Sequence, residues 1–193
     1  MFGSVHLPTR REFLLPALLS LGLISLAAHA QVNSNSSGVT LNATLPESMS
    51  VSATPAAVSF ALVQGAAVQG SAPVTITTSW VASAGRANVN LFAWFSNPVA
   101  ALTDGGTSAN NIPAAEVFGQ VATGLPTFFT AFNQTTVLGA ALGGLPLFTQ
   151  TLLSTNRSGS RVDNLVLKID LTNHAQLPAG TYTGTLNLQA QAL

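Results

Sequence analysis

The chain of 193 residues contains no cysteine. Without thiols it can form neither disulfide bonds nor thiolate metal sites. Its fold must therefore be held together by an apolar core alone, and a chain of this length can bury such a core within one domain.

Charged side chains are also scarce, at 6% of the sequence. Beyond residue 30 only four basic and five acidic side chains remain. Nucleic-acid binding depends mainly on lysine and arginine contacts with phosphates, and binding to anionic membranes depends on basic clusters. The composition therefore argues against both partners, whereas a net charge near zero favours contact between protein molecules.

After the N-terminus, the sequence has no uninterrupted apolar run of the ~20 residues that a membrane-spanning helix needs. The most apolar stretch, residues 124–153, is broken by glycines and prolines. We expect two or three short strands in it, with a short helix near residues 137–142 as the alternative. No membrane span is predicted for the mature chain.

Residues 1–30 have the features of an export signal. Arg10 and Arg11 precede an apolar run at residues 13–27, and small residues lead to a predicted cleavage site after Ala30. Residues 9–15, TRREFLL, resemble the twin-arginine signal, and an ordinary secretory signal remains the alternative. Either route predicts a protein of the periplasm, the cell surface or the extracellular space.

Strict alternation of apolar and polar residues is the main structural signal, and it is clearest at the C-terminus. Over residues 181–192, the even positions from Tyr182 to Ala192 are apolar or small and the odd positions are polar. This period of two predicts a long terminal β-strand with one buried face. Residues 162–172 alternate in the same way, with Leu165, Leu167, Ile169 and Leu171 predicted to point inward.

Two further alternating runs, residues 73–82 and 88–96, are separated by a short turn and predict a β-hairpin. In the second run, Val89, Leu91, Ala93 and Phe95 form one apolar face, but the opposite face also carries bulky rings. Pro55 is expected to divide residues 48–62 into two short strands, because proline cannot donate a ladder hydrogen bond.

About eight to ten short strands separated by Gly, Pro, Asn and Ser turns predict an all-β fold, an immunoglobulin-like β-sandwich of antiparallel strands. The predicted organisation is a signal peptide at residues 1–30, a flexible leader at residues 31–38 and one sandwich domain at residues 39–193. The domain would begin with Val39, Leu41, Ala43 and Leu45 on one face of a first or detachable strand.

No group of residues predicts a catalytic centre. His174 is the single histidine after residue 30, so a Ser-His-Asp arrangement would need it, with Asp163 or Asp170 as its partner. We interpret it instead as an exposed turn residue, and Glu47 and Glu116 as solvated charges.

A metal or cofactor site is not predicted either. Asp104, followed by two glycines, is interpreted as a turn rather than a calcium ligand, because calcium requires six to eight oxygen ligands.

Aromatic residues are the better candidates for binding. Phe92 and Trp94 could form a platform for a sugar or a protein partner, although core packing would also account for them. Trp80 is expected in the core. Tyr182, the only tyrosine, is expected to fix a corner through its hydroxyl group.

Residues 178–184, PAGTYTG, together with the alternating terminal strand, resemble the C-terminal signature of secreted bacterial fimbrial or pilin-like β-sandwiches of the spore coat protein U-like group. The resemblance implies an extracellular structural subunit, and many such subunits assemble by donor-strand exchange. Val39, Leu41, Ala43 and Leu45 would then complete the open sheet of a neighbouring copy. Such pilins often contain a disulfide, which this chain lacks, and residues 124–153 have no counterpart in them that we can name.

The sequence therefore predicts an exported, non-enzymatic structural or surface-interaction protein that self-associates through β-strand complementation. The alternative is a secreted carbohydrate- or protein-binding module that uses Phe92 and Trp94. A hydrolase dependent on His174 is the third possibility.

Overall fold

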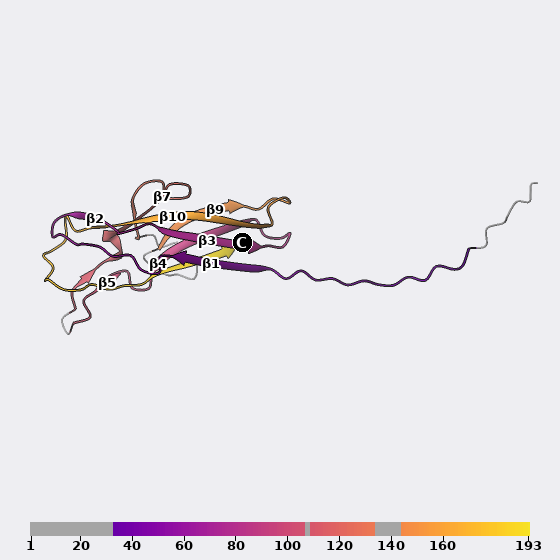
Figure 1. Ribbon diagram of the computed structural model, residues 1–193, viewed down its shortest axis with the longest axis horizontal. Coiled ribbons are helices and arrows are strands. Elements are labelled where there is room, and N and C mark those ends of the chain that lie inside the picture. The colour runs from indigo at the N-terminus through magenta and orange to yellow at the C-terminus, as the bar shows by residue number, and fades with distance from the viewer. Residues whose placement is uncertain (1–32, 107–108, 134–143) are drawn as a thin grey trace, which may run out of the picture. The chain divides into compact units, whose positions relative to one another are not determined.

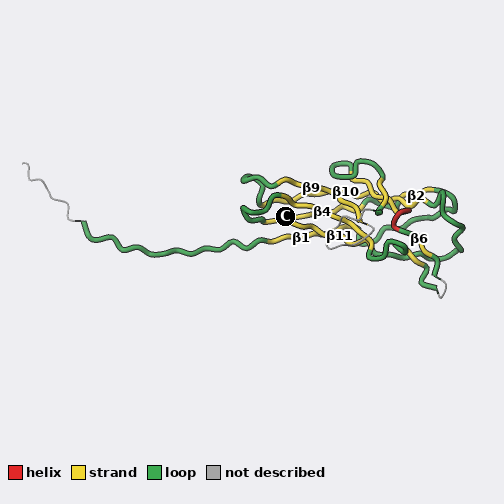
Figure 2. The backbone as a smooth tube through the Cα atoms, turned by 180° about the vertical axis from the view of Figure 1, so that it is seen from behind, coloured by secondary structure: helices red, strands yellow, loops and turns green. Residues whose placement is uncertain are grey.

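The computed structural model describes residues 33–106, 109–133 and 144–193. The chain divides into two units, Met1–Asn42 and Ala43–Leu193, and each is described by itself. Residues 33–42 of the first unit form no regular secondary structure (Figure 2). The predicted signal peptide at residues 1–30 lies outside the described residues. In the described ranges, no helix is long and apolar enough to cross a membrane.

The second unit consists of two main antiparallel sheets packed together as a β-sandwich, which confirms the predicted fold class (Figure 1). The first sheet has the strand order β1 (Ser48–Thr54), β3 (Val74–Val81), β10 (Ser158–Asp170), β7 (Val117–Val121) and β8 (Thr130–Ala131), with β2 (Ala67–Gln69) also paired to β10. The second sheet has the order β11 (Leu186–Ala192), β4 (Asn88–Phe95) and β9 (Gly144–Thr151). The small elements are β5 (Leu102–Thr103), β6 (Asn111–Ile112) and a 3-10 helix, η1 (Ala114–Glu116).

The core lies between the two sheets, where alternate residues of the central strands meet. The apolar faces that alternation predicted within residues 88–96 and 162–172 are buried: Val89, Leu91, Ala93, Phe95, Leu165, Leu167, Ile169 and Leu171. Trp80 on β3 is only 6% exposed, as expected, and its indole nitrogen donates a hydrogen bond to the Asn156 carbonyl oxygen at 3.0 Å.

The predicted hairpin between residues 73–82 and 88–96 is wrong. Both strands exist, but β3 pairs with β1 and β10, whereas β4 pairs with β11 and β9. The turn between them crosses from one sheet to the other, so their apolar faces meet across the core. Alternation specifies which face of a strand is buried but not which strand is its neighbour.

Two predicted strands are shorter than their alternating patterns. The terminal strand covers Leu186–Ala192, whereas alternation extends over residues 181–192. Similarly, β1 ends at Thr54, before Pro55, and residues 55–62 form no strand. The unpaired parts of both patterns lie next to each other in the fold, as described below.

The apolar stretch at residues 124–153 contains two short strands, β8 and β9, in agreement with the prediction. The alternative helix at residues 137–142 lies outside the described residues. At β9 the register shifts opposite Leu91 and Phe92, and this β-bulge lets the consecutive side chains of Leu147 and Phe148 both be buried.

Candidate functional site

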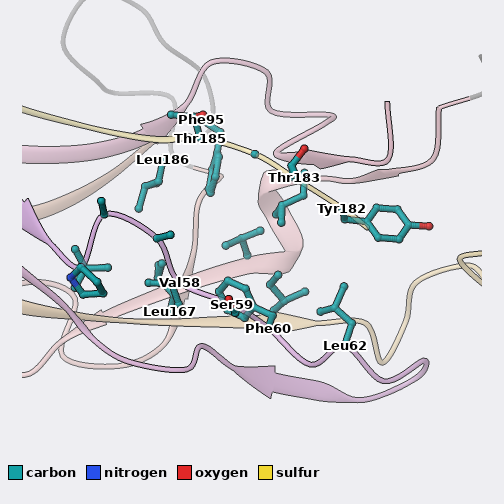
Figure 3. Close-up of a pocket in the computed structure, with 18 of the residues that line it drawn as sticks. Val58, Ser59, Phe60, Leu62, Phe95, Leu167, Tyr182, Thr183, Thr185 and Leu186 are labelled. Carbon is teal, nitrogen blue, oxygen red and sulfur yellow. The ribbon is translucent and has the colours of Figure 1, made fainter. Parts of the chain in front are cut away.

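A groove with a volume of about 720 Å³ opens where the two alternating patterns lose their strand pairing (Figure 3). One wall is formed by residues 53–62 and the other by residues 180–188. Its floor consists of core side chains from both sheets: Val74, Phe95, Val117, Leu167 and Ile169. We call this site the open groove.

The first wall is formed by the chain that follows β1. Val58, Phe60 and Leu62 line the groove and pack against the core. Gly70 leaves room for Val58 and Phe60, because a Cβ atom there would lie 2.5 Å from a Val58 methyl group and 3.3 Å from the Phe60 ring. The wall is tied to the body by main-chain contact, since the Ser71 N–H donates to the Ser59 carbonyl oxygen at 2.9 Å.

The second wall is the chain that precedes β11. Thr183 forms an isolated bridge with Thr103, with both N–H to O distances at 2.9 Å. The Tyr182 hydroxyl donates to the Pro178 carbonyl oxygen at 2.8 Å, which confirms that this tyrosine fixes a corner. At Gly184 the chain comes so close to Ala101 that a Cβ atom would overlap the Ala101 carbonyl oxygen.

The sandwich remains open along the groove and the two edge strands beside it. On the central strands the inward side chains are buried, whereas those of β1 and β11 are only partly buried. The partly buried apolar side chains gather on these edges, on the groove walls and on the adjacent loops: Met49, Val51, Val58, Phe60, Leu62, Leu102, Leu177, Tyr182, Leu186, Leu188, Ala190 and Ala192. In a closed sandwich, a further strand would cover such a row.

Val39, Leu41, Ala43 and Leu45, which were predicted to bind a partner, belong to neither sheet. We call residues 31–45, which include them, the leader. Val39 and Leu41 in the first unit are 81% and 88% exposed. Ala43 and Leu45, at the start of the second unit, are exposed as well, and residues 33–47 contain no strand. The alternating pattern of residues 39–45 is therefore unpaired in this structure.

Phe92 and Trp94 lie on β4 but face away from the core, opposite in direction to Leu91 and Ala93. Both are partly buried rather than fully exposed. Neither of them lines the open groove.

The expectation of an exposed His174 is wrong, although the residue does lie in a turn. Its side chain is 16% exposed, and Nδ1 lies 2.7 Å from a carboxylate oxygen of Glu116. The partner is thus Glu116, rather than Asp163 or Asp170, and Glu116 is not a solvated charge. The pair joins the turn after β10 to η1, two segments far apart in sequence.

Glu47 is exposed, with 40% of its side chain accessible, as expected of a solvated charge, and it is also paired. The Arg86 guanidinium donates to both of its carboxylate oxygens, at 2.9 and 3.1 Å, and the Ser83 N–H donates at 2.7 Å. These donors, the guanidinium first, lower the pKa of Glu47 from 4.5 to about 2.

Asp104 forms a turn as predicted. Its carboxylate accepts hydrogen bonds from the side chain and N–H of Asn110 and from the N–H of Gly106, and these bonds lower its pKa. Across the described part of the chain, no three acidic or histidine side chains lie together as metal ligands would.

No protein-family model, curated protein or solved structure matches the chain. The antiparallel all-β architecture is therefore established by the structure itself, and the function must be argued from the geometry of the groove and the sheet faces.

Proposed function

We propose that the protein is an exported structural or surface-interaction subunit that self-associates by β-strand complementation. The leader of one copy, with Val39, Leu41, Ala43 and Leu45 directed inward, occupies the open groove of a second copy. The open groove is the observation that carries this proposal, because the apolar side chains along its two walls, such as Phe60 and Leu186, are only partly buried.

The leader matches the two edge strands beside the groove in length and in pattern. Residues 39–45 alternate like a strand and equal β1 and β11 in length, at seven residues each. An extended segment of that length spans about 20 Å. Each fully buried valine or leucine side chain contributes about 1.5–3 kcal/mol, so Val39, Leu41 and Leu45 provide most of the apolar driving force.

The second wall presents main-chain groups for such a strand. Thr183 directs its N–H and carbonyl group toward Thr103. Because these groups alternate in direction along an extended chain, those of Tyr182 and Gly184 point away from β5. An inserted leader can hydrogen-bond to them and complete the sheet.

The same contact repeated between copies is heterologous, because it joins a leader to a groove rather than one patch to itself. Heterologous contacts that do not close into a ring generate filaments. The low charge of the chain and its resemblance to pilin-like subunits of the spore coat protein U-like group support this assembly, as does the export signal at residues 1–30, which would deliver the chain to the periplasm or the cell surface.

The exported chain should therefore run as a ladder on a denaturing gel when it is not boiled, and as one band after boiling. Deleting residues 31–45 should reduce the ladder to a monomer, because the donor strand is then missing. A ladder that survives the deletion would show that association uses another surface.

A matched pair of variants tests whether assembly depends on the side chains of the inward face of the leader or only on the presence of the segment. Replacing Val39, Leu41 and Leu45 with serine should abolish the ladder. Replacing Thr40, Asn42 and Thr44 with serine should preserve it, because these side chains would face solvent. Equal effects of the two triple variants would contradict insertion of an alternating strand.

A further inference from the structure

The outer face of the second sheet carries uncharged side chains that the open groove does not use. They come from alternate positions of β4 and β11. The strand register places Trp94 opposite Asn187, Phe92 opposite Gln189 and Asn90 opposite Gln191. We call these six residues the amide–aromatic face.

Each ring on this face has an amide on one side and a short residue on the other. Directly opposite residues of adjacent strands lie about 5 Å apart, so Asn187 and Gln189 flank the two rings. On the β9 side, Gly144 lies opposite Trp94 and Pro146 lies opposite Phe92. Neither of these two residues has a side chain that can form a hydrogen bond, so polar recognition by side chains is confined to the β11 side of the rings.

Asn90 adds an acceptor without a partner to this face. The residue is 7% exposed, and in the part of the chain that the structure describes no donor reaches its Oδ1 atom. Buried acceptors without a donor are rare in folded proteins. Its neighbours across the sheet are Gln191 and Thr149, so it shares the outer face with polar side chains from both adjacent strands.

One amide on the face is already held in place. The Asn187 side-chain nitrogen donates to the Ser96 hydroxyl oxygen at 3.1 Å and lies 3.4 Å from the Trp94 carbonyl oxygen. Its carbonyl oxygen is thereby oriented without cost to a later binding step. Oriented polar groups beside apolar rings are typical of ligand sites that fix the orientation of their ligand.

We propose that the amide–aromatic face binds a neutral saccharide chain. Amide side chains donate and accept hydrogen bonds at the same time, as sugar hydroxyl groups do. Phe92 and Trp94 offer flat apolar surfaces on which the C–H faces of sugar rings can stack. The ligand is neutral because none of the six side chains is charged.

A protein partner fits this face less well. The core of a protein interface is a contiguous apolar patch, whereas here amides alternate with rings. The large apolar side chains that are most exposed in the second unit, such as Val99 and Phe128, belong to other parts of the molecule.

This site does not depend on the open groove, since the two share no residue. If copies assemble into a filament, each contributes one such face. Weak binding at single faces would then add up to strong attachment to a polysaccharide through multivalency.

The test is a fluorescence titration of the exported chain. Trp80 is buried, so a change in emission on ligand binding reports on Trp94, the only other tryptophan. The probes are hexasaccharides of the cello, xylo, manno and chito series, with oligogalacturonate as a charged comparison. We expect a saturable change with at least one neutral series and none with oligogalacturonate.

Three variants make the test specific. Phe92→Ala removes a stacking ring and should weaken binding about tenfold. Gln189→Ala, an exposed substitution that should not disturb folding, should weaken it also. Thr77→Ala, on the outer face of the first sheet, is the control and should bind normally.

The proposal is overturned if no neutral series changes the emission, if oligogalacturonate binds equally well, or if both Gln189→Ala and Phe92→Ala bind like the unmodified chain. Deletion of residues 31–45 should leave single-site binding unchanged, so failure here is distinct from failure of strand complementation.

Discussion

At the scale of single residues, Gly184 determines how the second wall of the open groove is placed. It occupies an even position in the terminal alternating pattern, where the sequence predicted a small residue on the buried face of a strand. The structure gives it another role, because at this point the chain approaches the main chain at Ala101. Main-chain atoms cannot move aside as the end of a flexible side chain can.

Substituting Gly184→Ala should therefore destabilise the fold by about 1–3 kcal/mol, in the range of overpacking substitutions. The free energy of unfolding in urea provides the measurement. Gly85→Ala is the matched control, since a Cβ atom at Gly85 would meet nothing within 4 Å. Equal stability of the two variants would show that the close approach at Gly184 does not exist.

The hydrogen bonds that Arg86 and Ser83 donate to Glu47 make a contribution to folding stability that depends on pH. Since donors from Arg86 and Ser83 lower the pKa of Glu47 from 4.5 to about 2, the ionised carboxylate stabilises the folded state. This contribution is fully present above pH 4.5 and is lost as the pH falls through about 2.

The thermal midpoint should accordingly fall between pH 4.5 and about 2, with part of the fall due to Glu47. In Glu47→Gln the fall should be smaller, because no carboxylate titrates at that position. If the thermal midpoints of the two proteins fell in parallel with pH, these hydrogen bonds would not stabilise the ionised Glu47. Asp104 and Asp170, whose pKa values are also lowered, account for the remaining dependence in the variant.

At the scale of elements, alternation predicted which faces are buried, but not how strands pair. It correctly placed Leu165 and Leu167 of β10 in the core, and Pro55 at the end of β1. It failed for the supposed hairpin, because a five-residue turn can return to the same sheet or cross to the other. It also overextended the terminal strand, since residues 181–185 alternate but pair with the rest of the chain only through the single bridge from Thr183 to Thr103.

The open groove should bind the leader when the leader is added as a separate peptide. A peptide of residues 36–47, mixed with the chain that lacks residues 31–45, should bind the open groove and raise the thermal midpoint. At a concentration one hundred times its Kd, the stabilisation should be about 2.7 kcal/mol. The same peptide with serine at positions 39, 41 and 45 should have no effect, and an equal shift with both peptides would contradict groove binding.

At the scale of the whole molecule, the charged side chains are used internally. Each of the nine charged residues in the described ranges has an ionic or hydrogen-bonding partner, within the pairs Arg86–Glu47, Arg161–Asp163, Lys168–Asp170 and His174–Glu116 or, for Asp104 and Arg157, with neighbouring polar groups. The pairs Arg86–Glu47 and His174–Glu116 link segments distant in sequence. Their partners could not be predicted from local spacing, because the chain must first fold to bring them together.

If copies assemble as proposed, the internal use of every charge determines how that assembly responds to dissolved salt. Between about 0.01 M and 1 M salt, the distance over which charges act on one another falls from about 30 Å to about 3 Å. A contact formed by apolar side chains and main-chain hydrogen bonds has almost nothing for this screening to weaken. Fibres of such a subunit would hold together equally well in fresh water and in brine, and a cell that moves between the two would not shed them.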